Sequence, residues 1–179
     1  MAMQASPKQL ILKPQDLVLA LKLAVNRENS YLLATLGSEL QMVVSAVHAS
    51  VVRCEQARLI TRSNGVLRAY RPALTEFAIH GVRYVYPAVL GPLTRGVATI
   101  SAGPSLKDSF DQTKAMPTVW PDPLGDTYGT SLAPLCQNVP QACRVDQRLY
   151  DVLTLIDAVR GGASRERELA TTFIRERLT

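Results

Sequence analysis

Two helical patterns separated by a three-residue break constrain the fold of this chain most strongly. Leucines recur at the spacing of one helical face over residues 31–40, and this repeat stops at residues 41–43. A second pattern follows over residues 44–57, with apolar positions four and three residues apart, as one buried stripe requires. These positions are Val47, Val51 and Cys54. So short a break predicts a tight turn between two helices.

A third helix is expected before this pair. Lys13-Pro14 favours a helix start, because proline suits the first helical position, and the apolar repeat continues to about residue 25. The polar residues that follow end the pattern. Ser30 is then a candidate N-cap for the helix over residues 31–40.

A β-hairpin is expected after the pair. Asn64-Gly65 predicts the turn, because both residues tolerate positive φ, and the flanking strands would span residues 59–62 and 66–70. A fourth helix over residues 72–80 would pack back on this unit. Gly81 is the expected left-handed stop of that helix.

Residues that interrupt regular structure are concentrated in the middle of the chain. Eight of the eleven prolines and six of the ten glycines lie between residues 81 and 140. Residues 82–86 alternate as a strand does, and residues 96–100 are a second candidate strand. The segment around Trp120 shows little regular structure of its own. We expect residues 81–144 to pack on the helical unit as short strands and extended chain.

The C-terminal residues 145–179 are expected to form a helical hairpin. The two helices would span residues 146–160 and 164–178, with Gly161-Gly162 ending the first and Ser164 capping the second. Each helix carries one apolar stripe. Two uses remain open for these stripes: a two-fold dimer contact, or packing within the chain's own core.

Positive charge is concentrated in the first half of the chain. Residues 1–95 contain 11 Lys and Arg against 5 Asp and Glu, whereas residues 96–179 contain 9 against 10. A local surplus of this sign favours a polyanionic partner, although basic surfaces also serve solubility alone.

The composition indicates neither a cofactor nor a membrane segment. The three cysteines lack a CxxC spacing and only two histidines are present, so we expect no metal and predict reduced, mostly buried thiols. No apolar run is long enough to span a bilayer, and the first residues lack the pattern of a signal peptide. We therefore expect a cytoplasmic protein.

Signatures of catalysis are also lacking in the sequence. It contains no G-x-S-x-G, P-loop, HExxH or dinucleotide fingerprint, so we do not expect an enzyme. The enzymatic alternative is an acid–base site near His80 and the proline-rich middle.

The order helix, helix, tight turn, helix and hairpin resembles the winged helix-turn-helix of bacterial DNA-binding regulators, such as the MarR-like and IclR-like groups, over about residues 14–80. The residues that carry the resemblance are Leu36, Gly37, Leu40, Met42, Val47 and Val51. The chain departs from the pattern at Gln41, where the turn commonly has glycine, and at Val43, where a serine commonly caps the second helix. The resemblance implies an α+β, mainly α-helical protein with a winged unit over residues 13–80.

The resemblance also implies which side chains meet DNA. A helix in the major groove must present small or polar side chains to reach base edges, and a basic hairpin tip reaches the neighbouring backbone or minor groove. The predicted DNA contacts are Ser45, Ala46, His48, Ala49, Arg53, Arg62, Ser63, Asn64 and Arg68. As a structural alternative, Arg53 pairs with Glu55 or Glu39.

Two functions follow as expectations. The first is sequence-specific binding of double-stranded DNA by a homodimer that represses its own or a neighbouring operon. The alternative is a protein-interaction module, such as an antitoxin or adaptor, whose partner contacts Ala46, Ala49 and Val52. A ligand pocket between the two halves of the chain is a further alternative.

Overall fold

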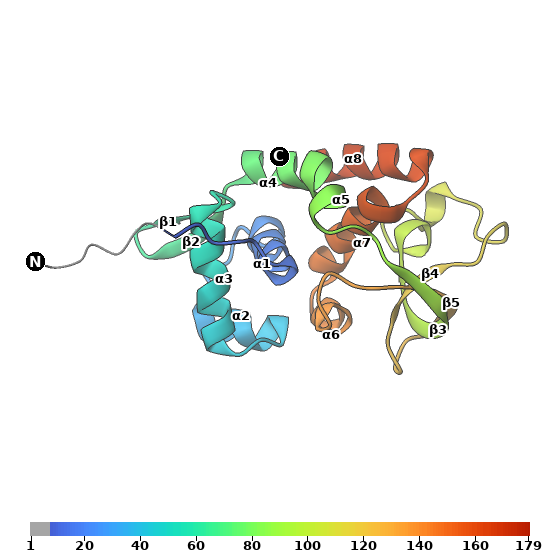
Figure 1. Ribbon diagram of the computed structural model, residues 1–179, viewed down its shortest axis with the longest axis horizontal. Coiled ribbons are helices and arrows are strands. Elements are labelled where there is room, and N and C mark those ends of the chain that lie inside the picture. The colour runs from blue at the N-terminus through green and yellow to red at the C-terminus, as the bar shows by residue number, and fades with distance from the viewer. Residues whose placement is uncertain (1–7) are drawn as a thin grey trace, which may run out of the picture.

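The computed structural model describes residues 8–179, so the beginning of the N-terminal stretch judged for a signal peptide lies outside the described residues. The protein is α+β and mainly helical. Figure 1 shows an elongated molecule, with the first helices of the chain and a hairpin at one end and a small sheet at the other. The elements of the first end are α1 (Pro14–Val25), α2 (Leu33–Leu40), α3 (Val44–Gln56), β1 (Ile60–Ser63) and β2 (Val66–Ala69).

α1 is the buried helix of this end. It begins at Pro14 as predicted, and the Asp16 carboxylate accepts the backbone N–H of Lys13 at 2.7 Å. α2 begins at Leu33, two residues later than predicted, and its N-cap position is Leu32. The prediction that Ser30 caps this helix was therefore wrong.

The break between α2 and α3 is a tight turn, as predicted. Gln41 is left-handed with φ 55°, and the backbone N–H of Met42 donates to the carbonyl oxygen of Gly37 at 2.8 Å. A Cβ on Gly37 would lie 2.6 Å from the carbonyl oxygen of Met42. The close approach of the two backbones therefore requires glycine at this position.

The predicted hairpin is confirmed within one residue at its strand ends. β1 and β2 are antiparallel, with Ser63 opposite Val66 at the turn. Asn64 and Gly65 both have positive φ, 50° and 78°, as a two-residue turn of this kind requires.

A continuous helical run follows the hairpin, so the helix predicted over residues 72–80 is confirmed, but the end predicted for it was wrong. It consists of α4 (Arg71–Glu76), the π-helical turn η1 (Phe77–Gly81) and α5 (Val82–Val85). Gly81 does not stop the helix: its φ is −101°, and the predicted strand over residues 82–86 is helical instead. The glycine is needed for packing, because a Cβ there would lie 2.7 Å from the ring of Phe77.

The middle of the chain forms a three-stranded sheet. β3 (Leu90–Thr99) pairs antiparallel with both β4 (Thr118–Pro121) and β5 (Thr127–Leu132), and β4 pairs parallel with β5. Two short 3-10 turns, η2 (Ile100–Ala102) and η3 (Lys107–Ser109), follow β3. The predicted strand over residues 96–100 is the end of β3, whereas the absence of regular structure around Trp120 was a wrong prediction.

The C-terminal helices are α6 (Val139–Val145), α7 (Gln147–Gly161) and α8 (Ser164–Leu178), and a buried carboxylate joins the sheet to α7. Asp157 on α7 accepts hydrogen bonds from Thr99 Oγ1 at 2.9 Å and from Trp120 Nε1 at 2.5 Å. It also accepts one from Arg160 at 2.5 Å. Trp120 is thereby fixed by a partner that is distant in sequence, which explains why the local pattern did not predict β4.

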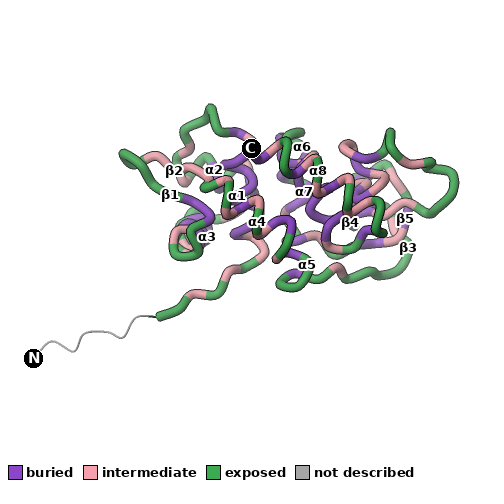
Figure 2. Tube along the Cα trace, turned by 90° about the horizontal axis from the view of Figure 1, so that it is seen from above, coloured by how far each residue is buried: buried purple, intermediate pink, exposed green. Residues whose placement is uncertain are grey.

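The C-terminal hairpin packs within the chain's own core. α7 is buried along residues 152–159 (Figure 2) and contacts α1, α5, α6 and α8. The N-cap of α8 is Ala163, not Ser164 as predicted, and Glu166 accepts its backbone N–H at 2.6 Å. Within residues 8–179, no helix combines the length and the apolar character needed to cross a membrane.

Candidate nucleic-acid interface

α3 has one buried and one exposed side. Its buried residues are Val47, Ser50, Val51 and Cys54, and the helix packs on α1 and α2. Ser45 and His48 are exposed, and Ala46 and Ala49 are half-buried beside them. Four of the predicted DNA contacts therefore lie together on or beside the outward face of one helix.

Arg53 lies elsewhere, in an ion pair inside the three-helix unit. Its Nε and one terminal nitrogen donate to the two oxygens of Asp16, both at 2.7 Å. Asp16 is fully buried, and the Arg53 side chain is 12% exposed. The hydrogen bonds to Asp16 raise the pKa of Arg53. Because its guanidinium is bound to Asp16, Arg53 is not part of the candidate interface, and its prediction as a DNA contact is not supported. The alternative that Arg53 pairs with Glu55 or Glu39 was also wrong, since its partner is Asp16.

The hairpin tip carries three of the predicted contacts. Arg62, Ser63 and Asn64 are exposed. The Nε of Arg62 donates to Glu55 Oε1 on α3 at 3.1 Å, and both side chains are partly exposed. Such surface pairs contribute about 0–1 kcal/mol, so a phosphate group can take the place of the carboxylate at small cost.

Arg58 also belongs to this surface, although it was not among the predicted contacts. It is exposed between α3 and β1 and has φ 58°, in the left-handed region. It lines a shallow pocket with Arg62 and Tyr70. The position of Arg58 in the arginine-rich stretch after α3 could have predicted that it belongs to this surface.

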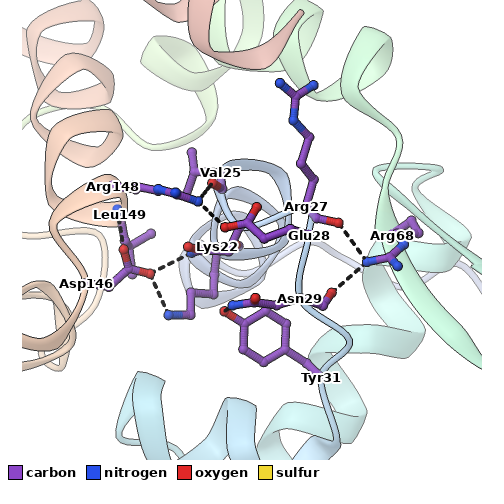
Figure 3. A network of polar contacts seen from close by, with 11 residues as sticks. Lys22, Val25, Arg27, Glu28, Asn29, Tyr31, Arg68, Asp146, Arg148 and Leu149 are labelled. Atoms are coloured by element: carbon purple, nitrogen blue, oxygen red, sulfur yellow. Dashed lines mark hydrogen bonds and ion pairs between the residues drawn. The ribbon is translucent and has the colours of Figure 1, made fainter.

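Arg68 is used to hold a loop. Its NH1 donates to the carbonyl oxygens of Arg27 and Asn29, at 3.0 and 2.6 Å (Figure 3). These carbonyls belong to the connection between α1 and α2. Arg68 therefore attaches that connection to β2, and it does not join the exposed residues of the hairpin tip.

A buried lysine joins α1 and α2 to the start of α7 (Figure 3). Lys22 on α1 lies 2.5 Å from Glu39 Oε2 on α2 and 2.5 Å from Asp146 Oδ2 at the start of α7. Burial lowers its pKa, but the bonds to the two carboxylates outweigh this effect and raise the pKa of Lys22. Asn26 also donates to Asp146, at 2.7 Å. Glu39 is thus an internal partner and adds no free carboxylate beside α3.

Large apolar side chains are exposed at the start of α2, in the turn that follows it and on α3. Leu32 is 74% exposed and Val43 is 70% exposed, and Val44 and Val52 are also exposed. Of these residues, only Val52 was predicted from the sequence to belong to a protein-contact face. Val43 occupies the position where the resembling proteins commonly have serine, which was the signal for this feature.

The cysteines are thiols, and two of them, Cys54 and Cys143, are buried. Burial raises the pKa of both thiols. Within the described part of the chain, no three His, Cys, Asp or Glu side chains are grouped so that they could hold a metal ion.

Comparison with known proteins gives no match: no family model matches the chain, and no curated protein or solved structure is significantly similar to it.

Proposed function

We propose that the protein binds double-stranded DNA through a winged helix-turn-helix over residues 13–80 and represses transcription. The observation that carries this proposal is the outward side of α3, where Ser45 and His48 are exposed with Ala46 and Ala49 beside them, together with the exposed basic hairpin tip that follows. α3 enters the major groove and the hairpin lies along the neighbouring backbone, the arrangement that a helix followed by a wing permits.

Each exposed residue has a role that suits its chemistry. Ser45 and His48 exchange hydrogen bonds with base edges, and the small Ala46 and Ala49 allow close approach to thymine methyl groups. At the hairpin, Arg62 and its neighbours Ser63 and Asn64 contact phosphates, with Arg58 beside them. Arg53 and Arg68 act indirectly, because their contacts hold α3 and the α1–α2 connection in place.

The repressor acts as a homodimer on a palindromic site of its own or a neighbouring operon, because two-fold symmetry in the protein matches two-fold symmetry in the DNA. The apolar stripe of α7 is buried within the chain. The homodimer proposal therefore does not depend on that stripe.

The test is fluorescence anisotropy with a labelled duplex from upstream of the gene, across a salt series and against a scrambled duplex. The upstream duplex should bind more tightly, with an affinity that falls steeply as salt rises. Arg62→Ala should reduce the slope of log affinity against log salt by about 1, as expected for one lost phosphate contact. Arg95→Ala is the matched control, because Arg95 lies on β3 at the other end of the molecule (Figure 1). Equal affinity for both duplexes, or no binding at low salt, would refute the proposal.

A second candidate function is a protein-interaction module, such as an antitoxin or adaptor. The exposed neighbours Val43 and Val44 favour it, because large apolar side chains that adjoin on a surface are typical of protein contacts. Val43→Asp with Val44→Asp should then abolish co-purification with the product of the adjacent gene. Retained co-purification in this double variant would exclude this surface as the contact.

A further inference from the structure

A pocket of about 590 Å³ lies between the η1–α5 segment and α8. These segments run side by side along one side of the molecule in Figure 1, and α8 contacts η1 and α4. His80 and Arg83 line the pocket from the first segment, and Arg167 and Arg175 line it from α8. Its volume is within the range of small-molecule sites, about 300–1,000 Å³.

The charge of this pocket is unbalanced. Three arginines line it against one carboxylate, Glu168. Within residues 8–179, none of the three arginines forms a salt bridge. Three arginines and one carboxylate leave a net positive charge at the pocket, which a bound anion would offset.

One of the arginines is also held in position by hydrogen bonds. Arg167 donates to the carbonyl oxygen of Gly162 at 2.8 Å and to Ser164 Oγ at 3.4 Å, which leaves its other N–H groups free for a ligand. The guanidinium of Arg83 lies over the ring of Tyr84, 5.2 Å from its centroid. Arg167 is thus preorganised, which reduces the entropy lost on binding.

The π-helical turn η1 points independently to a site at this place. Such turns are rare and occur frequently at functional sites. One extra residue in a turn rotates everything after it by about 100° about the helix axis, and here it precedes Arg83. His80 lies within the turn and lines the pocket. The departure from an α-helix therefore coincides with the residues that face the unbalanced charge.

We propose that this pocket binds a small molecule bearing phosphate groups. The planar guanidinium fork matches phosphate oxygens in pairs, and Ser164 and Thr171, which line the same pocket, carry hydroxyls that can donate further hydrogen bonds. The site is separate from α3 and the hairpin tip, and it does not depend on the proposed DNA binding. Because α4 and η1 connect the hairpin to this pocket, a ligand here contacts both halves of the chain.

The experiment is isothermal titration calorimetry of the whole chain with inorganic pyrophosphate at low salt. Pyrophosphate should bind the wild type, and Arg83→Gln and Arg175→Gln should each weaken binding about tenfold, as expected for one charge-assisted contact. Arg165→Gln is the matched control, because Arg165 is on α8, has the same charge and does not line the pocket. Melting temperatures establish that each variant is folded.

The outcomes separate the sources of the phosphate. No heat of binding to the wild type up to about 1 mM pyrophosphate would overturn the proposal, as would an equal loss in the Arg165→Gln control. A parallel titration with the upstream duplex distinguishes a free compound from the DNA backbone. If duplex and pyrophosphate compete and the pocket variants lose both, the phosphates belong to DNA and the small-molecule proposal is overturned. Pyrophosphate binding that persists beside bound duplex supports it, and failure of DNA binding alone leaves this result unaffected.

Discussion

Replacement of Arg53 by leucine should destabilise the fold and affect DNA binding only through folding. The variant leaves Asp16 charged, fully buried and without its cation. Removal of one partner from a buried pair costs about 3–5 kcal/mol, and we expect the lower end because Asp16 keeps the N–H of Lys13. A protein of this size loses about 2–4 °C of melting temperature per kcal/mol, so about 3 kcal/mol corresponds to ~6–12 °C.

Circular dichroism on heating measures this loss, and two further variants separate its causes. Asp16→Asn combined with Arg53→Leu should recover most of the melting temperature, because the neutral amide oxygen can still accept the Lys13 N–H. Arg62→Leu removes an arginine from an exposed pair and should cost about 0–1 kcal/mol. The reasoning fails if Arg53→Leu melts within about 2 °C of the wild type, or if the double variant is no more stable than Arg53→Leu.

Three other changes test the turn, the hairpin and the link to α7. Gly37→Ala places a Cβ 2.6 Å from the carbonyl oxygen of Met42, so urea denaturation should show about 1–3 kcal/mol of destabilisation. Gly65→Ala meets no atom within 4 Å and should cost only about 1–2 kcal/mol of left-handed strain by the same assay. Lys22→Met should cost about 3 kcal/mol near neutral pH. Burial raises the pKa of Asp146, but the hydrogen bonds that it accepts, above all the one from Lys22, outweigh burial and keep this pKa below its usual value. The pair therefore stabilises the fold near neutral pH, and this stabilisation is lost in acid as the carboxylate is protonated. The difference in urea midpoint between the wild type and Lys22→Met should therefore shrink below about pH 4. A difference that stays constant with pH would contradict a stabilising pair between Lys22 and Asp146.

Local patterns predicted the elements whose causes are local. The proline at the start of α1 and the stripe that includes Val47 and Val51 were sufficient for two helices. Asn64-Gly65 was sufficient for the hairpin, because the preference for positive φ belongs to those two residues themselves.

The failures share a non-local cause. Gly81 was interpreted as a helix stop, because nothing in its immediate sequence shows that the Phe77 ring packs against it. β4 was missed, because the position of Trp120 depends on Asp157, which lies 37 residues away. For the candidate interface, Arg53 could not be assigned from sequence, because its partner Asp16 is likewise 37 residues away.

The hydrogen bonds to the Asp157 carboxylate limit the order in which the parts of the protein can fold during synthesis. β3 and β4 leave the ribosome before α7, so Thr99 and Trp120 are synthesised before the acceptor that holds them. Until α7 is released, the buried indole N–H and the hydroxyl have no protein partner, and leaving such groups unsatisfied in a core costs about 1–3 kcal/mol each. A nascent chain arrested before residue 157 should therefore lack a formed sheet, and the middle segment cannot be excised as an independent unit.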